Sequence, residues 1–421
     1  MNPNITSIST LLGDMAAAAP VHKLPPTEDA LRHKLLLKKR PYHPGSELVV
    51  GGGPCNCSPR VLQTFANAPI LLPGVEVYEI MAELKEMLKY VFQTKNEATL
   101  ALQTSGTGGI DASLTNILEP GEKVIVGVMG EWGERIADVA RTRQLEIIEL
   151  IPQYSLVFTI DELAEAIIKH RPALLYITHG ETSTGVFQNL EGLGDICHKY
   201  NCLFAVDTVV TLGTIPLHVD RWNIDIAVSA SQKGARSLPG LAYLTFSPRA
   251  VKRIQSLKTP SPFYYNMLEL FKIWNCLNER SEYYYTYNSN LLSAAKEGLA
   301  EIIEDGLLET WNRHKILSKK LWKGLEKLEL KLFVKDPKIR LFPVTSIHLP
   351  PGVAFRPFKK YLVDQHHMHV GRGLGLTSNS CFRIGIMGYN ARSSVVDFVL
   401  EKISEAIEYF EEESRNTFIL K

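Results

Sequence analysis

Short apolar runs that alternate with amphipathic segments fill residues 123–247, and they restrict the fold more than any other feature of this 421-residue chain. Continuous apolar runs of six or seven residues are typical of strands that are buried on both faces of a sheet. We therefore predict a strand at each of six runs: KVIVGV (123–128), LEIIEL (145–150), ALLYIT (173–178), CLFAVD (202–207), IAVSAS (226–231) and LAYLTFS (241–247).

Segments with helical periodicity separate several of these runs, at residues 133–144, 159–170 and 190–201. A strand, a helix and a second strand in succession form a right-handed crossover between parallel strands. The predicted fold class is therefore α/β, with a large domain built on a mostly parallel sheet.

The pattern changes at about residue 290. Two long helical patterns flank the strand-like segments VTSIHLP and CFRIGIMG, which predicts a smaller α+β domain at the C-terminus. We place an N-terminal arm at residues 1–45, the large domain at 46–305 and the small domain at 306–421.

Charge and cysteine content exclude several classes of protein. With 46 Lys and Arg against 45 Asp and Glu, the chain has no net field that would attract nucleic acid or an anionic membrane. It also lacks a run of about 20 apolar residues, the length of a membrane-spanning helix. Cys55 and Cys57 have no second pair to complete a zinc site. We expect reduced thiols, an intracellular protein, and no metal, nucleic-acid or membrane partner.

Polar residues follow three of the predicted strands directly. HGETSTG (179–185) follows ALLYIT, Asp207 ends CLFAVD, and Gln232 and Lys233 follow IAVSAS. Because ligands of open α/β sheets bind outside the carboxyl ends of the strands, we expect these residues to face one cleft. Taken singly, such an aspartate is more often a helix cap and such a lysine is more often solvated.

A glycine-rich segment, SGTGG (105–109), leads directly into a helical pattern. Backbone N–H groups and hydroxyls at a helix N-terminus suit a phosphate, although no G-K-[ST] follows as it does in a P-loop. The alternative is a glycine-rich cap without a ligand. Trp132 follows another predicted strand, where its indole has the right shape to stack on a ligand ring; taken singly, such a tryptophan is more often a core or interface residue.

Together these groups match the needs of an enzyme that uses pyridoxal 5′-phosphate. A lysine amine binds the cofactor's aldehyde, an acid pairs with its pyridine nitrogen, and a Gly/Ser/Thr loop holds its phosphate. We therefore predict this cofactor, with Lys233 and Asp207 as the catalytic residues.

Four segments carry a resemblance to a known family: TSGTGGIDASLTNILEPGEKVIVGVMGEWGERIADVA, YITHGETSTGVFQNLEGL, AVDTVVTLGTIPLHVDRWNIDIAVSASQKG and FRIGIMG. From about residue 45 to 410 the chain resembles the class V (fold type I) aminotransferases, and within them the alanine–glyoxylate/serine–pyruvate and insect 3-hydroxykynurenine types. The resemblance implies a seven-stranded sheet and a homodimer with shared active sites. It also implies transfer of an amino group from alanine or serine to glyoxylate or pyruvate.

The resemblance further implies roles for individual residues. Lys233 forms the internal aldimine, and Asp207 pairs with the pyridine nitrogen. Arg383 binds the substrate carboxylate, for which a bidentate guanidinium is suited. Tyr283 and Thr286 reach the phosphate of the neighbouring subunit. The remaining implied cofactor-binding residues surround the phosphate or the ring: Ser105, Gly106, Thr107, Gln232, Trp132, Thr182 and Val209.

Several positions depart from the family pattern. GGGPCN (51–56) stands where the family has G-P-G-P-S-N, so Cys55 replaces a serine near the substrate, beside Asn56. The other departures are Thr107 for histidine or alanine, Thr182 for serine, Asn288 for proline, and the segment 67–81. The cofactor set is thus retained, while the predicted substrate residues Arg383, Asn56 and Cys55 lie in an altered pocket. Two alternatives stay open: a 3-hydroxykynurenine or kynurenine–glyoxylate transaminase that forms xanthurenic acid, and a non-catalytic paralogue.

Targeting signals give little guidance. The first 20 residues contain no Lys or Arg, which suits a flexible arm better than a secretory or transit peptide, and the final FILK is not of the S-K-L type. The family resemblance implies a peroxisomal location, with the mitochondrion and the cytoplasm as alternatives.

Overall fold

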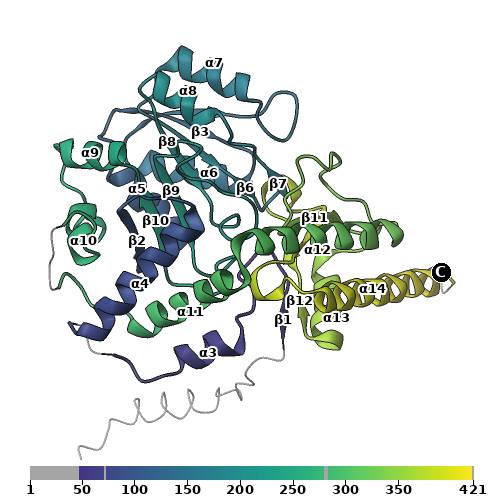
Figure 1. Ribbon diagram of the computed structural model, residues 1–421. Helices are drawn as coiled ribbons and strands as arrows, with labels where there is room; N and C mark the ends of the chain where they lie inside the picture. Colours follow the sequence, from purple (N-terminus) through teal and green to yellow (C-terminus); the bar gives the residue numbers. More distant parts are fainter. Residues whose placement is uncertain (1–46, 71–72, 279–282, 420–421) are drawn as a thin grey trace, which may run out of the picture. The chain divides into compact units, whose positions relative to one another are not determined.

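A seven-stranded sheet forms the centre of the protein (Figure 1). The structure is a computed structural model that describes residues 47–70, 73–278 and 283–419, so the predicted arm at 1–45 lies outside the described residues. The strand order is β2-β10-β9-β8-β5-β3-β4. Their bounds are β2 (Ala98–Leu102), β3 (Lys123–Gly127), β4 (Glu146–Leu150), β5 (Leu174–Thr178), β8 (Leu203–Asp207), β9 (Ile226–Ala230) and β10 (Ala242–Phe246).

The sheet is mostly parallel, which confirms the predicted fold class. β9, β8, β5, β3 and β4 pair in parallel, and β10 runs antiparallel to both of its neighbours, β9 and β2. The inner strands are buried along their whole length, as their continuous apolar runs require. β4 lies at the edge, and its sequence EIIEL accordingly exposes both glutamates.

Helices cover the sheet between the strands. The three predicted helical segments correspond to α6 (Glu131–Thr142), α7 (Ile160–His170) and α8 (Leu193–Lys199). α5 packs on β9 and β10, and α6 packs on β3, β4 and β5. The remaining helices of this part are α3 (Pro59–Phe65), α4 (Val75–Phe92), α5 (Gly106–Thr115), α9 (Pro248–Ser256), α10 (Met267–Ile273) and α11 (Ser289–Asp305).

A second, smaller sheet lies in the C-terminal part. It has the antiparallel order β11-β14-β13, and the two-residue strand β1 (Leu48–Val49) pairs separately with β12 (Met368–His369). Around them lie α12 (Leu307–Lys327), α13 (Phe355–His366) and α14 (Ser393–Ile419), with β11 (Val344–His348), β13 (Gly371–Arg372) and β14 (Cys381–Gly385).

Two clusters of buried apolar side chains follow this division. They meet within α12, where Trp311 packs with the cluster of the large sheet and Leu317 with that of the small one. The division of residues 46–421 into two domains at 305/306 stays a prediction.

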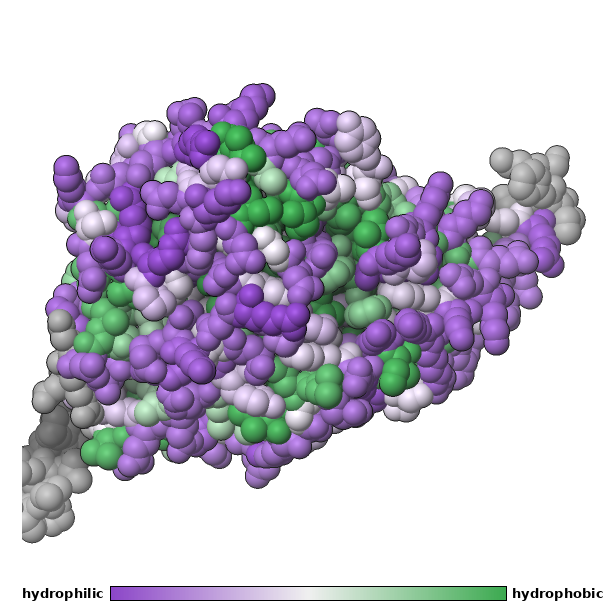
Figure 2. Space-filling view, turned by 45° about the horizontal axis from the view of Figure 1, so that its top comes forward, coloured by the Kyte–Doolittle hydropathy of each residue, from purple (hydrophilic) through white to green (hydrophobic). Residues whose placement is uncertain are grey.

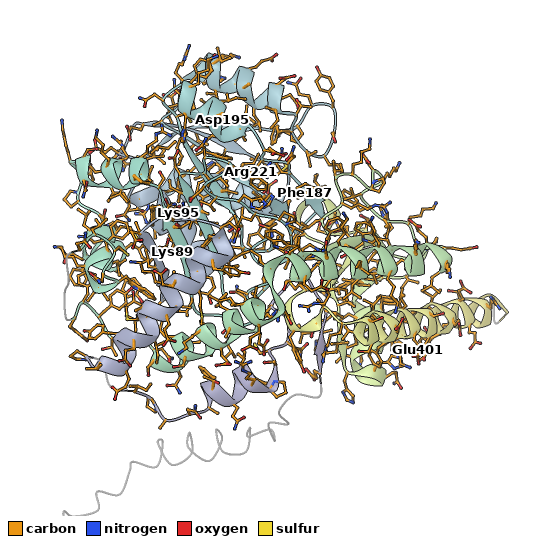
Figure 3. The ribbon with its side chains drawn as sticks, in the orientation of Figure 1. Lys89, Lys95, Phe187, Asp195, Arg221 and Glu401 are labelled. Atoms are coloured by element: carbon orange, nitrogen blue, oxygen red, sulfur yellow. The ribbon has the colours of Figure 1, made fainter. Side chains whose placement is uncertain are left out.

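Charged side chains cover much of the described surface. On the face shown in Figure 2, hydrophilic residues predominate and hydrophobic residues appear in separate patches between them. Figure 3 shows how such side chains stand away from the ribbon, for example Asp195 on α8 and Glu401 on α14, which are both exposed. In the described part of the chain, the helices are all too short or too polar to cross a bilayer.

Candidate active site

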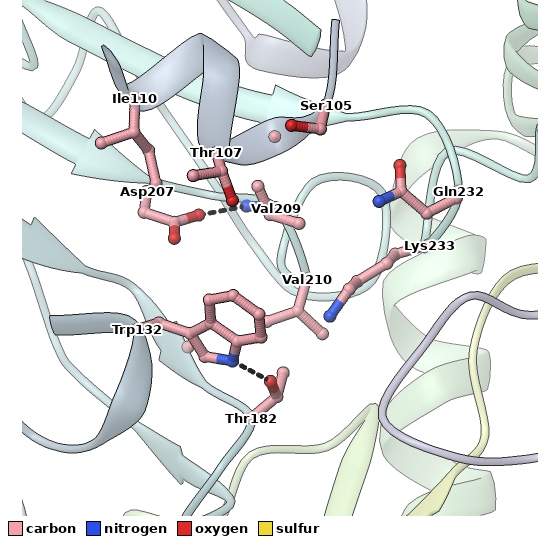
Figure 4. A pocket seen from close by; sticks show the side chains of 12 residues that line it. Ser105, Thr107, Ile110, Trp132, Thr182, Asp207, Val209, Val210, Gln232 and Lys233 are labelled. Carbon is pink, nitrogen blue, oxygen red and sulfur yellow. Dashed lines mark hydrogen bonds between the residues drawn. The ribbon is translucent and has the colours of Figure 1, made fainter. Parts of the chain in front are cut away.

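A cavity of about 110 Å³ opens at the carboxyl ends of the central strands (Figure 4). Nine of the residues that line it are ones that the sequence singled out: Ser105, Gly106, Thr107, Trp132, Thr182, Asp207, Val209, Gln232 and Lys233. They come from five separate segments of the chain. Their meeting in one cavity is what the position of strand ends in an α/β sheet requires.

One wall of the cavity is the N-terminus of α5. Ser105 is the N-cap residue of this ten-residue helix, and its Oγ accepts a hydrogen bond from the Gly108 N–H at 3.1 Å. The N–H groups of the first helical turn have no partner inside the helix, so those of Gly106 and Thr107 can bind an anion. A Cβ at Gly106 would lie 3.2 Å from Val209 Cγ2, so a glycine suits this tight packing.

Gln232 lies on the same side of the cavity. Its side-chain oxygen is buried, and it has no hydrogen-bond partner among the described residues. A rotation of the amide by 180° would instead present the NH₂ group, which is a donor suited to an anion. Gln232 thus adds a side-chain group to the backbone donors of α5.

Lys233 follows β9 and reaches into the cavity from a tight turn. Its Nζ donates a hydrogen bond to the Gly52 carbonyl at 2.7 Å and lies 5.7 Å from the centre of the Trp132 ring. Burial, and secondly the charge of Arg383, lower the pKa of Lys233 to about 8. A larger share of this amine is therefore neutral and nucleophilic at neutral pH than for an exposed lysine.

Asp207 is the last residue of β8 and is buried. Its Oδ1 accepts a hydrogen bond from the Val209 N–H at 2.8 Å, which makes a local turn after the strand. Burial raises the pKa of Asp207 to about 6, although the Val209 N–H and the charge of Lys233 act in the opposite direction. A cation near its carboxylate would lower this raised pKa and hold the group ionised.

The indole of Trp132 lines the cavity together with Val209 and Val210. Its Nε1 donates a hydrogen bond to Thr182 Oγ1 at 2.6 Å. The backbone of Trp132 belongs to the first turn of α6, where β3 ends. Trp132 is therefore held through its backbone in α6 and through its ring nitrogen by Thr182.

Arg383 lies next to the backbone of Gly52 and Thr182 and does not line the cavity itself. Its Nε donates to the Arg372 carbonyl at 2.8 Å and its NH1 to the Thr182 carbonyl at 3.0 Å. A Cβ at Gly52 would lie 2.6 Å from NH1, so the glycine allows the guanidinium to approach the backbone. Burial lowers the pKa of Arg383, and the charge of Glu181 opposes this.

Two further predicted residues, Cys55 and Asn56, use their side chains elsewhere. Cys55 Sγ donates to the Lys233 carbonyl at 3.3 Å, and burial raises the pKa of its thiol to about 11. Asn56 Oδ1 accepts from Val49 N at 2.9 Å and from Asn390 Nδ2 at 3.0 Å. Neither residue lines the cavity, and their roles in substrate binding stay predictions.

Tyr283 and Thr286 also lie outside the cavity. The two hydroxyls hydrogen-bond to each other at 2.7 Å, and the Tyr283 side chain is 49% exposed. Both hydroxyls are thus presented at the surface of the chain.

Sequence reasoning missed two residues that line the cavity, Ile110 and Val210. Each has a signal in the sequence: Val210 follows Val209, and Ile110 stands one helical turn after Thr107. Of the segment 179–185, which was expected to face the cleft, Gly180 and Thr182 line the cavity and Glu181 is buried without lining it. The expectation was wrong for His179, which belongs to the core beside Phe187 and Trp222, where burial lowers its pKa to about 3.

The chain is similar in sequence to known aminotransferases. The sequence profile of the family described as aminotransferase class V matches residues 68–398. The chain is 38% identical to an alanine–glyoxylate aminotransferase of Rattus norvegicus over 387 residues, which is 92% of each chain. It is 37% identical to a protein of the same name from Drosophila melanogaster over 375 residues, 89% of this chain and 95% of that protein.

The fold is shared as well. A crystal structure of an alanine–glyoxylate aminotransferase from Nostoc sp. superposes with a TM-score of 0.85 at 36% identity. The match covers 89% of this chain and 98% of that one. The family resemblance seen in the sequence is confirmed, and the chain belongs to the class V aminotransferases.

Proposed function

We propose that this aminotransferase moves the amino group of alanine to glyoxylate with the help of pyridoxal 5′-phosphate. The observation that carries the proposal is the meeting of a buried amine, Lys233, and a buried carboxylate, Asp207, in a cavity that ends at the N-terminus of α5. The substrate pair is that of the relatives from Rattus norvegicus, Drosophila melanogaster and Nostoc sp.. Serine and pyruvate are the second donor and the second acceptor in this proposal.

The residues present fit this cofactor. Ser105, Gly106, Thr107 and Gln232 would hold its phosphate, because they combine first-turn N–H groups, hydroxyls and the buried amide described above. Trp132 and Val209 would hold the two faces of its ring. Thr182 would lie at the ring hydroxyl and Asp207 at the pyridine nitrogen. When bound, the cofactor supplies an electron sink for the bond that breaks at the substrate's α-carbon.

Lys233 has two tasks in this proposal. Its neutral amine, favoured by the lowered pKa, would hold the cofactor. Once free, Nζ would accept the proton from the substrate's α-carbon as a general base and later donate it as a general acid. Asp207, when ionised, would favour the protonated form of the pyridine nitrogen.

Arg383 would bind the α-carboxylate that all these substrates share. Arg383→Ala is expected to lower kcat/KM for both alanine and glyoxylate roughly 30- to 1,000-fold, because a bidentate charged contact is lost. This factor corresponds to a loss of about 2–4 kcal/mol of transition-state stabilisation. Arg383→Lys keeps the positive charge but lacks the bidentate guanidinium, so its kcat/KM should lie between those of the wild type and Arg383→Ala. Steady-state kinetics with each substrate varied would measure the loss. Unchanged KM values for both substrates would contradict the assignment.

The donor is the least constrained part of the proposal. The test is to measure kcat/KM for alanine, serine and 3-hydroxykynurenine as donors at saturating glyoxylate, with the wild-type protein and its bound cofactor. The proposal expects kcat/KM to be highest for alanine. A higher value for 3-hydroxykynurenine would replace alanine by the aromatic donor, and no turnover with any donor would favour a non-catalytic paralogue.

We further propose a homodimer in which Tyr283 and Thr286 serve the partner's site. The surface position of both hydroxyls, away from the chain's own cavity, supports this arrangement. A Lys233→Ala chain mixed with a Tyr283→Ala/Thr286→Ala chain should then recover activity. One site of each heterodimer collects both defects and the other collects none, so random reassociation restores about a quarter of the wild-type activity.

A matched mixture serves as the control for this rescue. Lys233 and Arg383 belong to the same chain's site, so mixing Lys233→Ala with Arg383→Ala chains should leave every site defective. Equal recovery in the two mixtures, or none in the first, would show that Tyr283 and Thr286 do not act across a dimer.

The compartment follows from family resemblance alone. We propose the peroxisome on that ground, and residues 420–421 lie outside the described residues. Fluorescence microscopy of a fusion that leaves the C-terminus free would test it, and a purely mitochondrial or cytoplasmic signal would overturn it.

A further inference from the structure

Helix α6, which carries Trp132, has no N-cap of its own. Gly130 stands at the N-cap position and has no side chain to accept the first N–H groups of the helix. Acceptors come instead from the segment after β5, about 50 residues away. Ser183 Oγ accepts from Glu131 N at 3.0 Å, and Glu181 Oε2 accepts from Trp132 N at 3.0 Å and from Gly133 N at 3.4 Å.

The other oxygen of Glu181 is fixed as well. Oε1 accepts hydrogen bonds from the backbone N–H of Ser183 at 2.9 Å and from the Ser183 hydroxyl at 2.6 Å. The carboxylate thus has four donors and is completely buried. A Cβ at Gly130 would lie 2.9 Å from Glu181 Cγ and would also clash with Ser183 Oγ, so the close approach needs this glycine.

The same short segment also holds the Trp132 side chain. Thr182, between Glu181 and Ser183, accepts the hydrogen bond of the indole Nε1. Trp132 is therefore held at its backbone by Glu181 and at its ring nitrogen by Thr182. A side chain with only two rotatable bonds is fully oriented by these two contacts.

We propose that Glu181, together with Ser183, is a positioning residue that sets the plane of the Trp132 indole for the ring of the bound cofactor. The proposal rests on the function proposed above, because it takes the cavity as the site of pyridoxal 5′-phosphate. Glu181 acts through Trp132 and does not line the cavity itself.

The four donors explain why a carboxylate stands here. A carboxylate only accepts hydrogen bonds, so both of its oxygens satisfy the groups around them. A glutamine in the same place would turn its NH₂ group toward two donors in either orientation of the amide, and two hydrogen bonds would be lost. Burial raises the pKa of Glu181 to about 7, and the hydrogen bonds from Ser183 and Trp132 oppose that rise.

A double-mutant cycle separates positioning from simple helix capping. The dissociation constant of pyridoxal 5′-phosphate is measured for the wild type, Glu181→Gln, Trp132→Ala and the double variant. Glu181→Gln should weaken binding about tenfold, from the loss of two hydrogen bonds, and by less than about twofold when Trp132 is already alanine. Near-ultraviolet circular dichroism of the cofactor-free proteins gives a second readout, because the change caused by Glu181→Gln should vanish in the Trp132→Ala background.

Glu131→Gln is the matched control. Like Glu181→Gln, it removes one carboxylate beside the first turn of α6. The Glu131 carboxylate, however, pairs with Arg135, whose NH2 lies 3.5 Å from Glu131 Oε1. Its cofactor affinity should stay within about twofold of the wild type. If Glu181→Gln does not fold, Ser183→Ala takes its place in the cycle, because it removes the hydroxyl that links Glu181 Oε1 to the Glu131 N–H.

Equal losses of affinity in both backgrounds, or no loss from Glu181→Gln, would overturn the proposal. Failure of the wild-type protein to bind pyridoxal 5′-phosphate would instead overturn the proposed function. The dichroism of the cofactor-free proteins would then still decide whether Glu181 orients Trp132.

Discussion

Lys233→Ala is expected to fold and to lose turnover by roughly 10⁴-fold or more, the upper end of what a positioned acid–base group contributes. Lys233 offers a buried amine in the cavity, and its lowered pKa suits the proposed roles of nucleophile and base. The variant should still bind pyridoxal 5′-phosphate, because the N-terminus of α5, Trp132 and Asp207 are untouched. Single-turnover and steady-state rates with alanine and glyoxylate would measure the loss.

Two further variants show whether the charge or the amine of Lys233 matters. Lys233→Arg keeps a cation but cannot lose its proton at accessible pH, so it should be as inactive as Lys233→Ala. Lys252→Ala, at an exposed lysine of α9, should keep wild-type rates. Partial rescue of Lys233→Ala by an added small primary amine would support the acid–base role. Near wild-type turnover in Lys233→Ala alone would refute the catalytic assignment.

The second large effect is expected from Asp207→Asn, because this change separates the hydrogen bond that Asp207 accepts from Val209 from its proposed contact with the pyridine nitrogen. An asparagine can still accept the Val209 N–H and preserve the turn after β8, but it carries no charge for the pyridine nitrogen. The protonated pyridine nitrogen of the bound cofactor would then be buried without an anionic partner. Removing one partner of a buried ion pair costs about 3 kcal/mol or more, which is at least roughly a hundredfold in rate. Cofactor affinity should fall together with the rate.

Asp207→Glu keeps the charge and should be the milder change. Stopped-flow rates for the alanine half-reaction and cofactor dissociation constants would compare the two variants with the wild type. Thermal unfolding of the cofactor-free proteins checks that the turn persists in Asp207→Asn. If Asp207→Asn matches the wild type in rate and affinity, Asp207 is only a structural turn residue.

Periodicity in the sequence was enough to predict six of the seven strands of the large sheet. All six apolar runs are strands, and each of the three amphipathic segments overlaps a helix. The pattern does not show which strands pair, so neither the order β2-β10-β9-β8-β5-β3-β4 nor the reversed direction of β10 could be predicted. β2 was not recognised individually, and the two-residue strands β6 (Gly180–Glu181) and β7 (Val186–Phe187) are too short to show a period.

The cavity was predictable where its residues follow strand ends, since that position alone brings Asp207, Gln232 and Lys233 together. Contacts that depend on how distant segments pack were not predictable. Arg383 hydrogen-bonds to Thr182, 201 positions away in the sequence, and Trp132 hydrogen-bonds to Glu181, 49 positions away. The roles of these residues toward cofactor and substrate stay predictions.

Chemical trapping of the cofactor tests the central proposal most directly. The purified wild-type protein, loaded with pyridoxal 5′-phosphate, is reduced with borohydride, which makes the bond between a lysine amine and the cofactor permanent. Peptide mass spectrometry then locates the modified residue. We predict that Lys233 carries the reduced cofactor and that a prior excess of alanine, which displaces the amine, prevents the modification. Labelling of a different lysine, or no labelling at all, would contradict the proposed active site.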